Sequence, residues 1–273
     1  MIQRVFRRVS SFTPLLAMAL PFASTPGVAA QRPLVGQPIQ AAASPVLADG
    51  SAALPGAVST TSDDPAALAE AALRALSMHV VKSSHPEALR TAFRAYHNYR
   101  AAHPDLVRKP YLYFVDFGLD GRSARGYVFD MERLSVVDGP FTVAHGRGSS
   151  RDRTGVPTQF SNRAGSLASS LGVYLAQETY TFSGKSGGRS YNSVGLRMRG
   201  ESGSFNDAAR ARGIVAHGAP YVTAGSAGRS QGCPAMEPRR AQRLLPMLSN
   251  GGVVFIYSPN DTRWLQRDPW IKT

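Results

Sequence analysis

The sequence of 273 residues contains one cysteine, Cys233, and only 18 acidic residues against 31 lysines and arginines. A single cysteine has no partner for an intramolecular disulfide, which excludes a small disulfide-stapled fold. No apolar run reaches the roughly 20 residues that cross a bilayer, so we expect no transmembrane segment. The sequence also lacks internal repeats, a nucleotide-binding glycine fingerprint and the residue spacing of a metal site, so we expect no cofactor and no metal.

The shortage of acidic residues leaves a net charge of +13. Such an excess favours polyanionic partners, among them anionic cell-wall polymers, membrane surfaces and nucleic acid. The basic residues are scattered, however, without a long Lys/Arg run and without a C2H2 or RRM motif. We therefore expect no nucleic-acid partner and interpret the basic residues as a solvated surface.

Residues 1–30 have the features of a secretory signal peptide. A basic start is followed by the apolar core Leu15 to Phe22 and by the small residues Val28-Ala29-Ala30 as a cleavage site. Removing this segment takes away three arginines and no acidic residue, so the net charge falls from +13 to +10. The sequence thus predicts an exported protein of the periplasm or cell envelope. Residues 31–62, rich in Ala, Pro, Gly and Ser, predict a flexible tether.

The predicted export of the protein limits the roles that its single cysteine can have. In an oxidising compartment a structural cysteine is normally paired, so Cys233 is either buried, part of an intermolecular bridge, or a reactive thiol. We favour the reactive thiol, because the residues around it are rich in glycine and serine.

The remaining chain divides into a helical element at 63–108, a β-rich domain at 109–258 and a polar tail at 259–273. Asp64-Pro65 is typical of a helix start, and a second helix is expected from near Pro86. We expect a mainly β fold with small helices, a mixed β sandwich or barrel preceded by the two N-terminal helices. Strands are predicted at Tyr111–Phe117, Gly126–Met131, Leu134–Val137, Phe141–Ala144, Gly172–Phe182, Val194–Arg199, Ile214–His217 and Gly252–Tyr257, with a turn at Asp138–Pro140, a long loop at Arg147–Arg163, and helices at Asn206–Arg212 and Pro238–Leu248.

The stretch from Gly213 to Met236 carries the chemistry. His217 closes a short apolar strand, and a Gly/Ser-rich loop leads from it to Cys233, which lies between Gly232 and Pro234. A thiolate attacks carbonyl groups, and a histidine within reach can take the thiol proton and return it to a leaving amine. Exposed N–H groups around Gln231, Gly232 and Cys233 can bind the oxyanion. The alternative is structural, with a small buried thiol and a core histidine whose hydrogen bonds are satisfied.

These residues resemble the murein L,D-transpeptidase catalytic-domain family, which has the YkuD-like fold. The resemblance covers roughly Tyr111 to Tyr257, and its centre is the Ser-Gln-Gly-Cys-Pro-Ala sequence that ends at Ala235. It implies that Cys233 is the nucleophile and His217 the base, that the main chain of Gly218 orients the histidine, and that Ser230 starts the oxyanion turn. The motifs that carry the resemblance are Tyr111-Leu112 through Asp116-Phe117, Val143-Ala144-His145-Gly146, Phe160-Ser161-Asn162, Leu171-Gly172-Val173-Tyr174, Glu178-Thr179-Tyr180, Ala216-His217-Gly218-Ala219 and Gly228 to Ala235.

The resemblance further implies a reaction on peptidoglycan stem peptides, which serve as donor and acceptor. The cysteine cleaves a stem tetrapeptide before its terminal D-Ala, and the acyl group passes to the side-chain amine of a second stem, forming a 3→3 cross-link. Two alternatives stay open. Water can replace the amine, which gives an L,D-carboxypeptidase, or the domain can be a catalytically silent cell-wall-binding module.

Two positions depart from the commonest form of the family. Gln231 stands where a histidine usually precedes the Gly-Cys pair, and Ala235 stands where an arginine usually follows the cysteine. The group that binds the substrate carboxylate is therefore open. We expect Arg229 in this role, with Arg147 and Arg197 as further candidates, and we expect His145 and Tyr221 to line the cleft.

Overall fold

The computed structural model describes residues 64–272, so the predicted signal peptide and tether lie outside the described residues. Its centre is one eight-stranded sheet in the order β11-β7-β6-β5-β12-β1-β2-β3. The strands, in that order, are Ala235–Met236, Val215–Gly218, Arg189–Gly200, Gly172–Ser186, Val253–Tyr257, Tyr111–Asp116, Gly126–Asp130 and Ser135–Phe141. Two short pairs accompany it, β4 (His145–Gly146) with β10 (Arg229–Ser230) and β8 (Val222–Thr223) with β9 (Ser226–Ala227).

The sheet mixes parallel and antiparallel neighbours. β1 pairs in parallel with β12, and β11 pairs in parallel with β7, whereas the other neighbours in the main sheet are antiparallel. The central strands β1 and β12 are buried along almost their whole length. The predicted mainly β fold class with a few small helices is confirmed.

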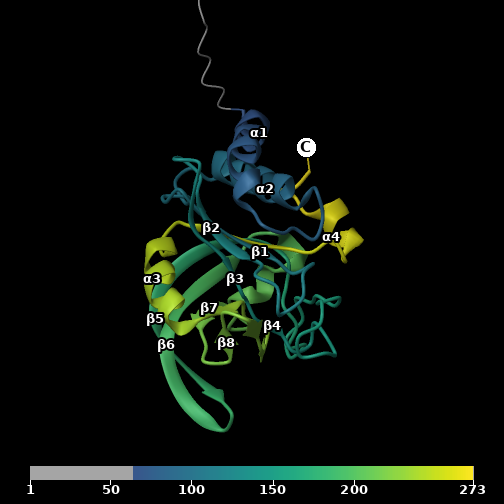
Figure 1. Ribbon diagram of the computed structural model, residues 1–273. Helices are drawn as coiled ribbons and strands as arrows, with labels where there is room; N and C mark the ends of the chain where they lie inside the picture. Colours follow the sequence, from purple (N-terminus) through teal and green to yellow (C-terminus); the bar gives the residue numbers. More distant parts are fainter. Residues whose placement is uncertain (1–63, 273) are drawn as a thin grey trace, which may run out of the picture. The chain divides into compact units, whose positions relative to one another are not determined.

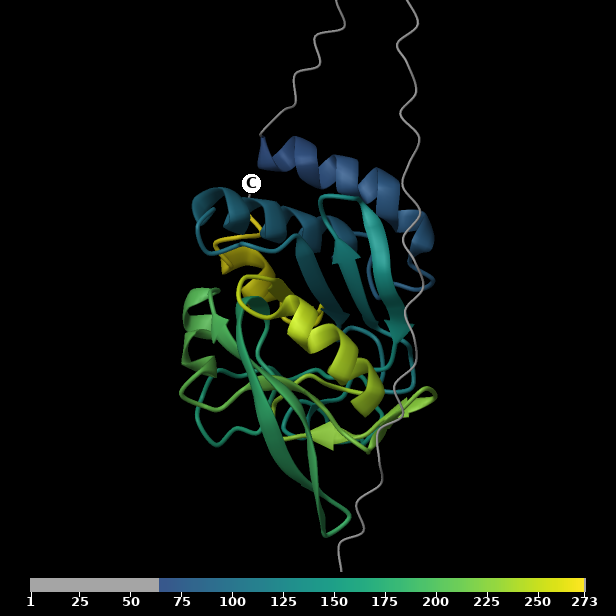
Figure 2. The ribbon, with the colours of Figure 1, turned by 90° about the vertical axis from the view of Figure 1, so that its left-hand side faces the viewer.

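Helices cover the sheet (Figures 1 and 2). α1 (Pro65–Leu76) begins at Asp64, whose carboxylate accepts hydrogen bonds from the amides of Ala66 and Ala67, as the sequence predicts for an N-cap. α2 (Ala88–Ala102) packs beside α1, and α3 (Pro238–Leu248) packs against β6 and β7. Apolar residues of all three helices share one core with the sheet. None of the helices in the described part of the chain is long and apolar enough to cross a membrane.

The longest strands form a hairpin that projects past the rest of the sheet (Figures 1 and 2). β5 and β6 remain paired up to Ser186 and Arg189, whereas the sequence predicted strands that end at Phe182 and resume at Val194, with the small residues between them in a loop. Gly187 and Gly188 both have positive φ (57° and 78°), which a two-residue hairpin turn of type I′ requires. The prediction of a loop was wrong because pairing between strands, and not the propensity of the serines and glycines, decides this segment.

Two other local predictions were wrong. The predicted turn at Asp138–Pro140 lies inside β3, where Asp138 forms ion pairs with Arg240 and Arg243 of α3. The predicted helix at Asn206–Arg212 is replaced by two 3₁₀ turns, Gly203–Phe205 and Asp207–Ala209. The side chain of the buried Asn206 accepts from the Ser202 amide and donates to the Val173 carbonyl. Such side-chain to backbone bonds compete with a regular helix.

The segment predicted as a polar tail is folded onto the core. It contains α4 (Thr262–Arg267), which begins at Asp261 and buries Trp264 completely. The indole of Trp264 lies against Phe255 and Tyr257 and donates to the buried Asp268 (2.7 Å). A six-residue helix with one buried side chain is too short for hydrophobic periodicity to reveal it.

Candidate active site

The nucleophile and base predicted from the sequence lie on a turn and on a strand that are neighbours in space. His217 lies in β7, and β11 pairs with it in parallel so that Ala235 stands opposite His217. Cys233 lies two residues before Ala235, at the end of the turn that leads from β10 to β11. The Gly/Ser-rich loop between them folds into β8, β9 and β10, and this brings both side chains to one cavity.

Ser230 holds the turn in shape. Its hydroxyl accepts from the Gly232 amide (3.1 Å) and donates to the Cys233 carbonyl (2.6 Å). Gly232 has φ +125°, and a Cβ there would lie 2.8 Å from Ile214, so only glycine fits without strain. Because the Gly232 amide is already engaged, it is not free to bind an oxyanion. The amides of Gln231 and Cys233 find no acceptor among the described residues and are the donors that remain.

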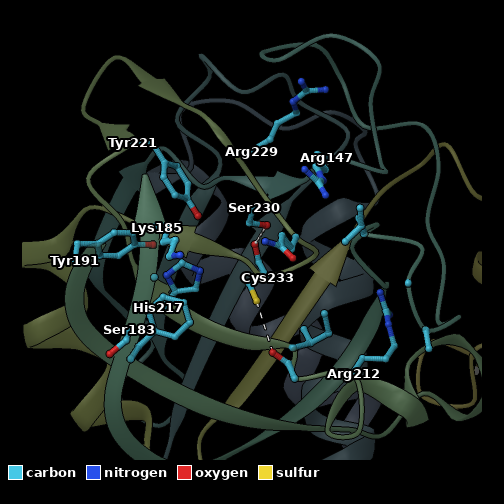
Figure 3. A pocket seen from close by; sticks show the side chains of 18 of the residues that line it. Arg147, Ser183, Lys185, Tyr191, Arg212, His217, Tyr221, Arg229, Ser230 and Cys233 are labelled. Atoms are coloured by element: carbon cyan, nitrogen blue, oxygen red, sulfur yellow. Dashed lines mark hydrogen bonds between the residues drawn. The ribbon is translucent and has the colours of Figure 1, made fainter. Parts of the chain in front are cut away.

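The thiol of Cys233 is protonated in the resting site. The side chain is 9% exposed, and its Sγ donates a weak hydrogen bond to the Gly213 carbonyl (3.8 Å; Figure 3). Burial raises the pKa of the Cys233 thiol, while the Val215 amide and the Arg212 guanidinium oppose that shift. The direction of the net shift means that a base must take the proton when the sulfur attacks.

His217 has the tautomer that a base requires. Its Nδ1 lies 3.0 Å from the Gly218 carbonyl oxygen, which can only accept, so Nδ1 carries the proton. Nε2 is therefore unprotonated and has a free lone pair. Burial lowers the pKa of His217 to about 4, although the bond to Gly218 acts in the opposite direction. The imidazole is thus neutral at pH 7, and this contact is the one expected if the main chain of Gly218 orients the histidine.

The cavity that these two residues share has a volume of about 900 Å³. Four basic side chains line it, and no acidic side chain of the described residues does. Figure 3 shows His217 with Tyr191 and Tyr221 on one side of Cys233, and the arginines on the other. Such a cavity favours an anionic ligand, because cations in a partly enclosed site attract and orient negative charge. The basic residues are Arg147, Lys185, Arg212 and Arg229.

The L,D-transpeptidase catalytic domain family matches residues 81–257 of this sequence. The chain belongs to this family. The resemblance predicted from the sequence is thus confirmed for the family as a whole, whereas the Ser-Gln-Gly-Cys-Pro-Ala branch remains a prediction. The match begins before the predicted start of the β-rich domain and includes α2.

Similar solved structures share little sequence with this family member. An L,D-transpeptidase from Mycobacterium smegmatis is 14% identical with a TM-score of 0.33, over 54% of this chain and 58% of that one. One from Stackebrandtia nassauensis is 14% identical with a TM-score of 0.35, over 64% and 69% of the two chains. No curated protein matches the sequence. At these values neither structure bears on the substrate of this domain.

Only some of the predicted substrate-binding residues of this L,D-transpeptidase-family domain line the cavity. Tyr221 and Arg229 line the cavity, and Arg229 also donates to the carbonyls of Ser150 and Arg151. Arg197 lies outside the cavity lining and pairs with Glu178 (3.1 Å).

His145 is fully buried and does not belong to the cavity lining. Its Nδ1 accepts from the buried guanidinium of Arg125 (2.8 Å), and its pKa is lowered to about 3 by burial and by the positive charges of Arg125 and Arg229. This placement does not support the predicted role of His145 as a residue of the cleft. His145 instead belongs to β4, which pairs with β10 directly before the cysteine turn.

Sequence reasoning missed three residues of the site. Arg212 lines the cavity and holds the segment before β5 through the carbonyls of Ser161 and Ala168. Phe182 and Tyr191 reach the cavity from the β5–β6 hairpin. The only signal in the sequence was that both aromatic residues stand in a stretch of small polar residues, where no core requires them.

Proposed function

We propose that this protein is a cysteine-dependent peptidoglycan L,D-transpeptidase that forms 3→3 cross-links between stem peptides. The observation that carries the proposal is the shared cavity of Cys233 and His217, in which Nδ1 of the histidine is held by Gly218 and Nε2 is free. Membership of the L,D-transpeptidase catalytic domain family supports the reaction class. A substrate in the cell wall agrees with the predicted export of the protein.

The first half-reaction forms an acyl-enzyme. Sγ of Cys233 attacks the carbonyl carbon of the residue before D-Ala, and its proton passes to Nε2 of His217. The oxyanion of the tetrahedral intermediate accepts hydrogen bonds from the amides of Gln231 and Cys233. The carbon–nitrogen bond then breaks, and His217 returns the proton to the departing amine of D-Ala. A thioester remains on Cys233.

The second half-reaction needs a second substrate. The amine of another stem attacks the thioester carbonyl, His217 takes a proton from that amine, and the sulfur leaves and regains a proton. The presence of two cavities favours transfer to a second stem peptide over hydrolysis by water. A second cavity of about 670 Å³, formed by residues 147–159, adjoins the first, and Arg147 and Arg229 line both. A hydrolase would need room for only one peptide.

Arg147 is the better candidate for the substrate carboxylate. Its guanidinium is exposed at the junction of the two cavities and makes no hydrogen bond or ion pair with the described residues. One nitrogen of the Arg229 guanidinium already donates to two backbone carbonyls, and Arg197 is paired with Glu178. A guanidinium that is unpaired in the resting site can offer both of its parallel donors to a carboxylate.

Arg147→Ala is expected to raise KM for a stem tetrapeptide about tenfold and to leave kcat within about twofold, because the lost ion pair acts before and during the reaction alike. Steady-state kinetics of D-Ala release checks this. Arg197→Ala is the matched control and should leave both constants unchanged. A fall in kcat with unchanged KM would show that Arg147 does not anchor the substrate.

The pH dependence of the reaction follows from the neutral forms of Cys233 and His217. Because the pKa of His217 is lowered to about 4, the base is unprotonated throughout the range from pH 8 to pH 5. We expect kcat/KM for the free enzyme to show no inflection near 6.5, the ordinary imidazole value, and to fall only as the pH approaches about 4. Circular dichroism at each pH separates this titration from acid unfolding. An inflection between pH 6 and 7 in folded protein would contradict a neutral, buried base.

Mass spectrometry of the products tests the proposed function. The protein without its first 30 residues is incubated with a purified disaccharide-tetrapeptide. Loss of D-Ala together with a linked dimer is the expected result. Loss of D-Ala with monomer alone would instead establish the carboxypeptidase. No change in a folded sample, with retained binding to cell-wall material, would establish the silent binding module.

A further inference from the structure

Phe182 makes a close ring contact with the proposed base. The ring centroids of Phe182 and His217 are 4.0 Å apart, and the ring planes are inclined by 17°, so the two rings are stacked. His217 is therefore restrained in two ways. Its Nδ1 is held at one edge by the Gly218 carbonyl, and one face of the imidazole is covered by Phe182.

This contact spans a whole strand. Phe182 belongs to β5 and His217 to β7, and β6 runs between them. In β6 it is Gly195 that stands opposite His217, and the same glycine stands opposite Tyr180 of β5. Tyr180 and Phe182 are two residues apart and lie on the same face, so Phe182 reaches His217 diagonally across the glycine.

The absence of a side chain at Gly195 makes the contact possible. A Cβ at this position would lie 2.7 Å from the Tyr180 ring, which would have to move, and 3.0 Å from Cβ of Phe182, which is a tight contact. A glycine inside a strand weakens the strand, and it commonly marks a place where another group approaches closely. Here the group that approaches is the aromatic ring that covers the imidazole.

We propose that Phe182 is a positioning residue, which holds the imidazole plane of His217 so that Nε2 faces the cavity of Cys233. The inference rests on the proposed function of the Cys233–His217 pair. A single hydrogen bond at Nδ1 leaves the imidazole free to tilt about that bond, and the stacked ring removes this freedom. Catalytic groups need their geometry held within about 0.5 Å by packing around them.

Two other roles of Phe182 give different results. As a wall of the substrate cavity it would contribute to binding, and its loss would raise KM. As a structural part of the hairpin it would contribute to stability, and its loss would lower the melting temperature without a selective effect on turnover. As a positioning residue it affects kcat, because the base must be aligned only when a proton is transferred.

The test compares Phe182→Leu with Phe182→Tyr. Leucine keeps an apolar side chain but removes the flat ring, and we expect kcat to fall at least about tenfold with KM within about twofold. Tyrosine restores the ring, and kcat should return to within about threefold of the original. Tyr180→Leu is the matched control, since Tyr180 lies on the same face of the same strand and does not stack on His217. It should leave kcat unchanged.

Alkylation of Cys233 by iodoacetamide gives a readout that needs no peptide substrate. Cys233 is the only cysteine, so the rate of mass increase reports on this thiol alone. We expect Phe182→Leu to slow alkylation at pH 7 by about the same factor as His217→Ala, whereas Phe182→Tyr should not. This assay keeps the inference testable if the stem peptide proves not to be the substrate, because it depends only on the thiol and its base.

Several outcomes would overturn the inference: unchanged kcat in Phe182→Leu, a loss confined to KM, a failure of tyrosine to restore turnover, or an equal loss in Tyr180→Leu. Thermal unfolding of each variant is measured in parallel. If Phe182→Leu does not fold, Phe182→Met replaces it, because its flexible side chain fills the same space without a ring. The same criteria then apply.

Discussion

Cys233→Ala is expected to abolish release of D-Ala and formation of the linked dimer, with a loss of at least about 10⁴-fold in kcat. The physical reason is that the reaction has no other nucleophile: Cys233 is the single cysteine, and an alanine cannot form the thioester. Stability should change by no more than about 1 kcal/mol, since the thiol lies at a cavity wall and its hydrogen bond to the Gly213 carbonyl is long and weak. Product analysis by mass spectrometry, with thermal unfolding alongside, measures both.

Cys233→Ser tests whether the loss of activity comes from the thiol chemistry and not from the shape of the side chain. Serine keeps the shape of the side chain, but a hydroxyl beside a neutral histidine is a far weaker nucleophile than a thiol, so we expect nearly the same loss. Full activity in folded Cys233→Ala would rule out the acyl-enzyme. Cell-wall binding that is unchanged in Cys233→Ala, together with no turnover in the original protein, would instead support the silent binding module.

Gly232→Ala is expected to lower kcat/KM by about 100-fold or more, although neither Cys233 nor His217 is replaced. Alanine at φ +125° is strained, and its Cβ would meet Ile214 at 2.8 Å and the Ala168 carbonyl oxygen at 3.0 Å. Relief of that strain moves the turn, and with it the thiol and the amides of Gln231 and Cys233. Displacement of a catalytic group by about 1 Å can cost about 100-fold. Strain of this kind also costs about 1–3 kcal/mol of stability.

Gly203→Ala is the control that distinguishes the effect of backbone strain in general from the effect of strain in the cysteine turn. Gly203 also has positive φ (57°), but no atom lies within 4 Å of a Cβ built there, and the residue is outside the cavity lining. It should therefore lose some stability and no activity, as measured by thermal unfolding and D-Ala release. Equal loss of activity in both variants would mean that general destabilisation, and not the turn geometry, explains the result for Gly232.

Much of the fold could be predicted because its signals are local. The helix start at Asp64, the buried strands β1 and β12 and the helix at Pro238 each follow from a cap, a run of apolar residues or a proline within a few positions. The β5–β6 hairpin and the buried Trp264 escaped prediction, because strand pairing and a single indole in the core are decided by distant residues.

The sequence by itself determined which residue we predict as the nucleophile and which loop carries it. One cysteine between a glycine and a proline, after a histidine at the end of an apolar strand, limits the chemistry to these residue types. The tertiary structure alone decided the rest of the site. Four features depend on which groups lie within about 3 Å in space: the tautomer of His217, the engaged amide of Gly232, the burial of His145, and the Arg147 guanidinium, which has no partner within residues 64–272. Such neighbours come from strands and loops far apart in the chain, where sequence spacing carries no information about distance.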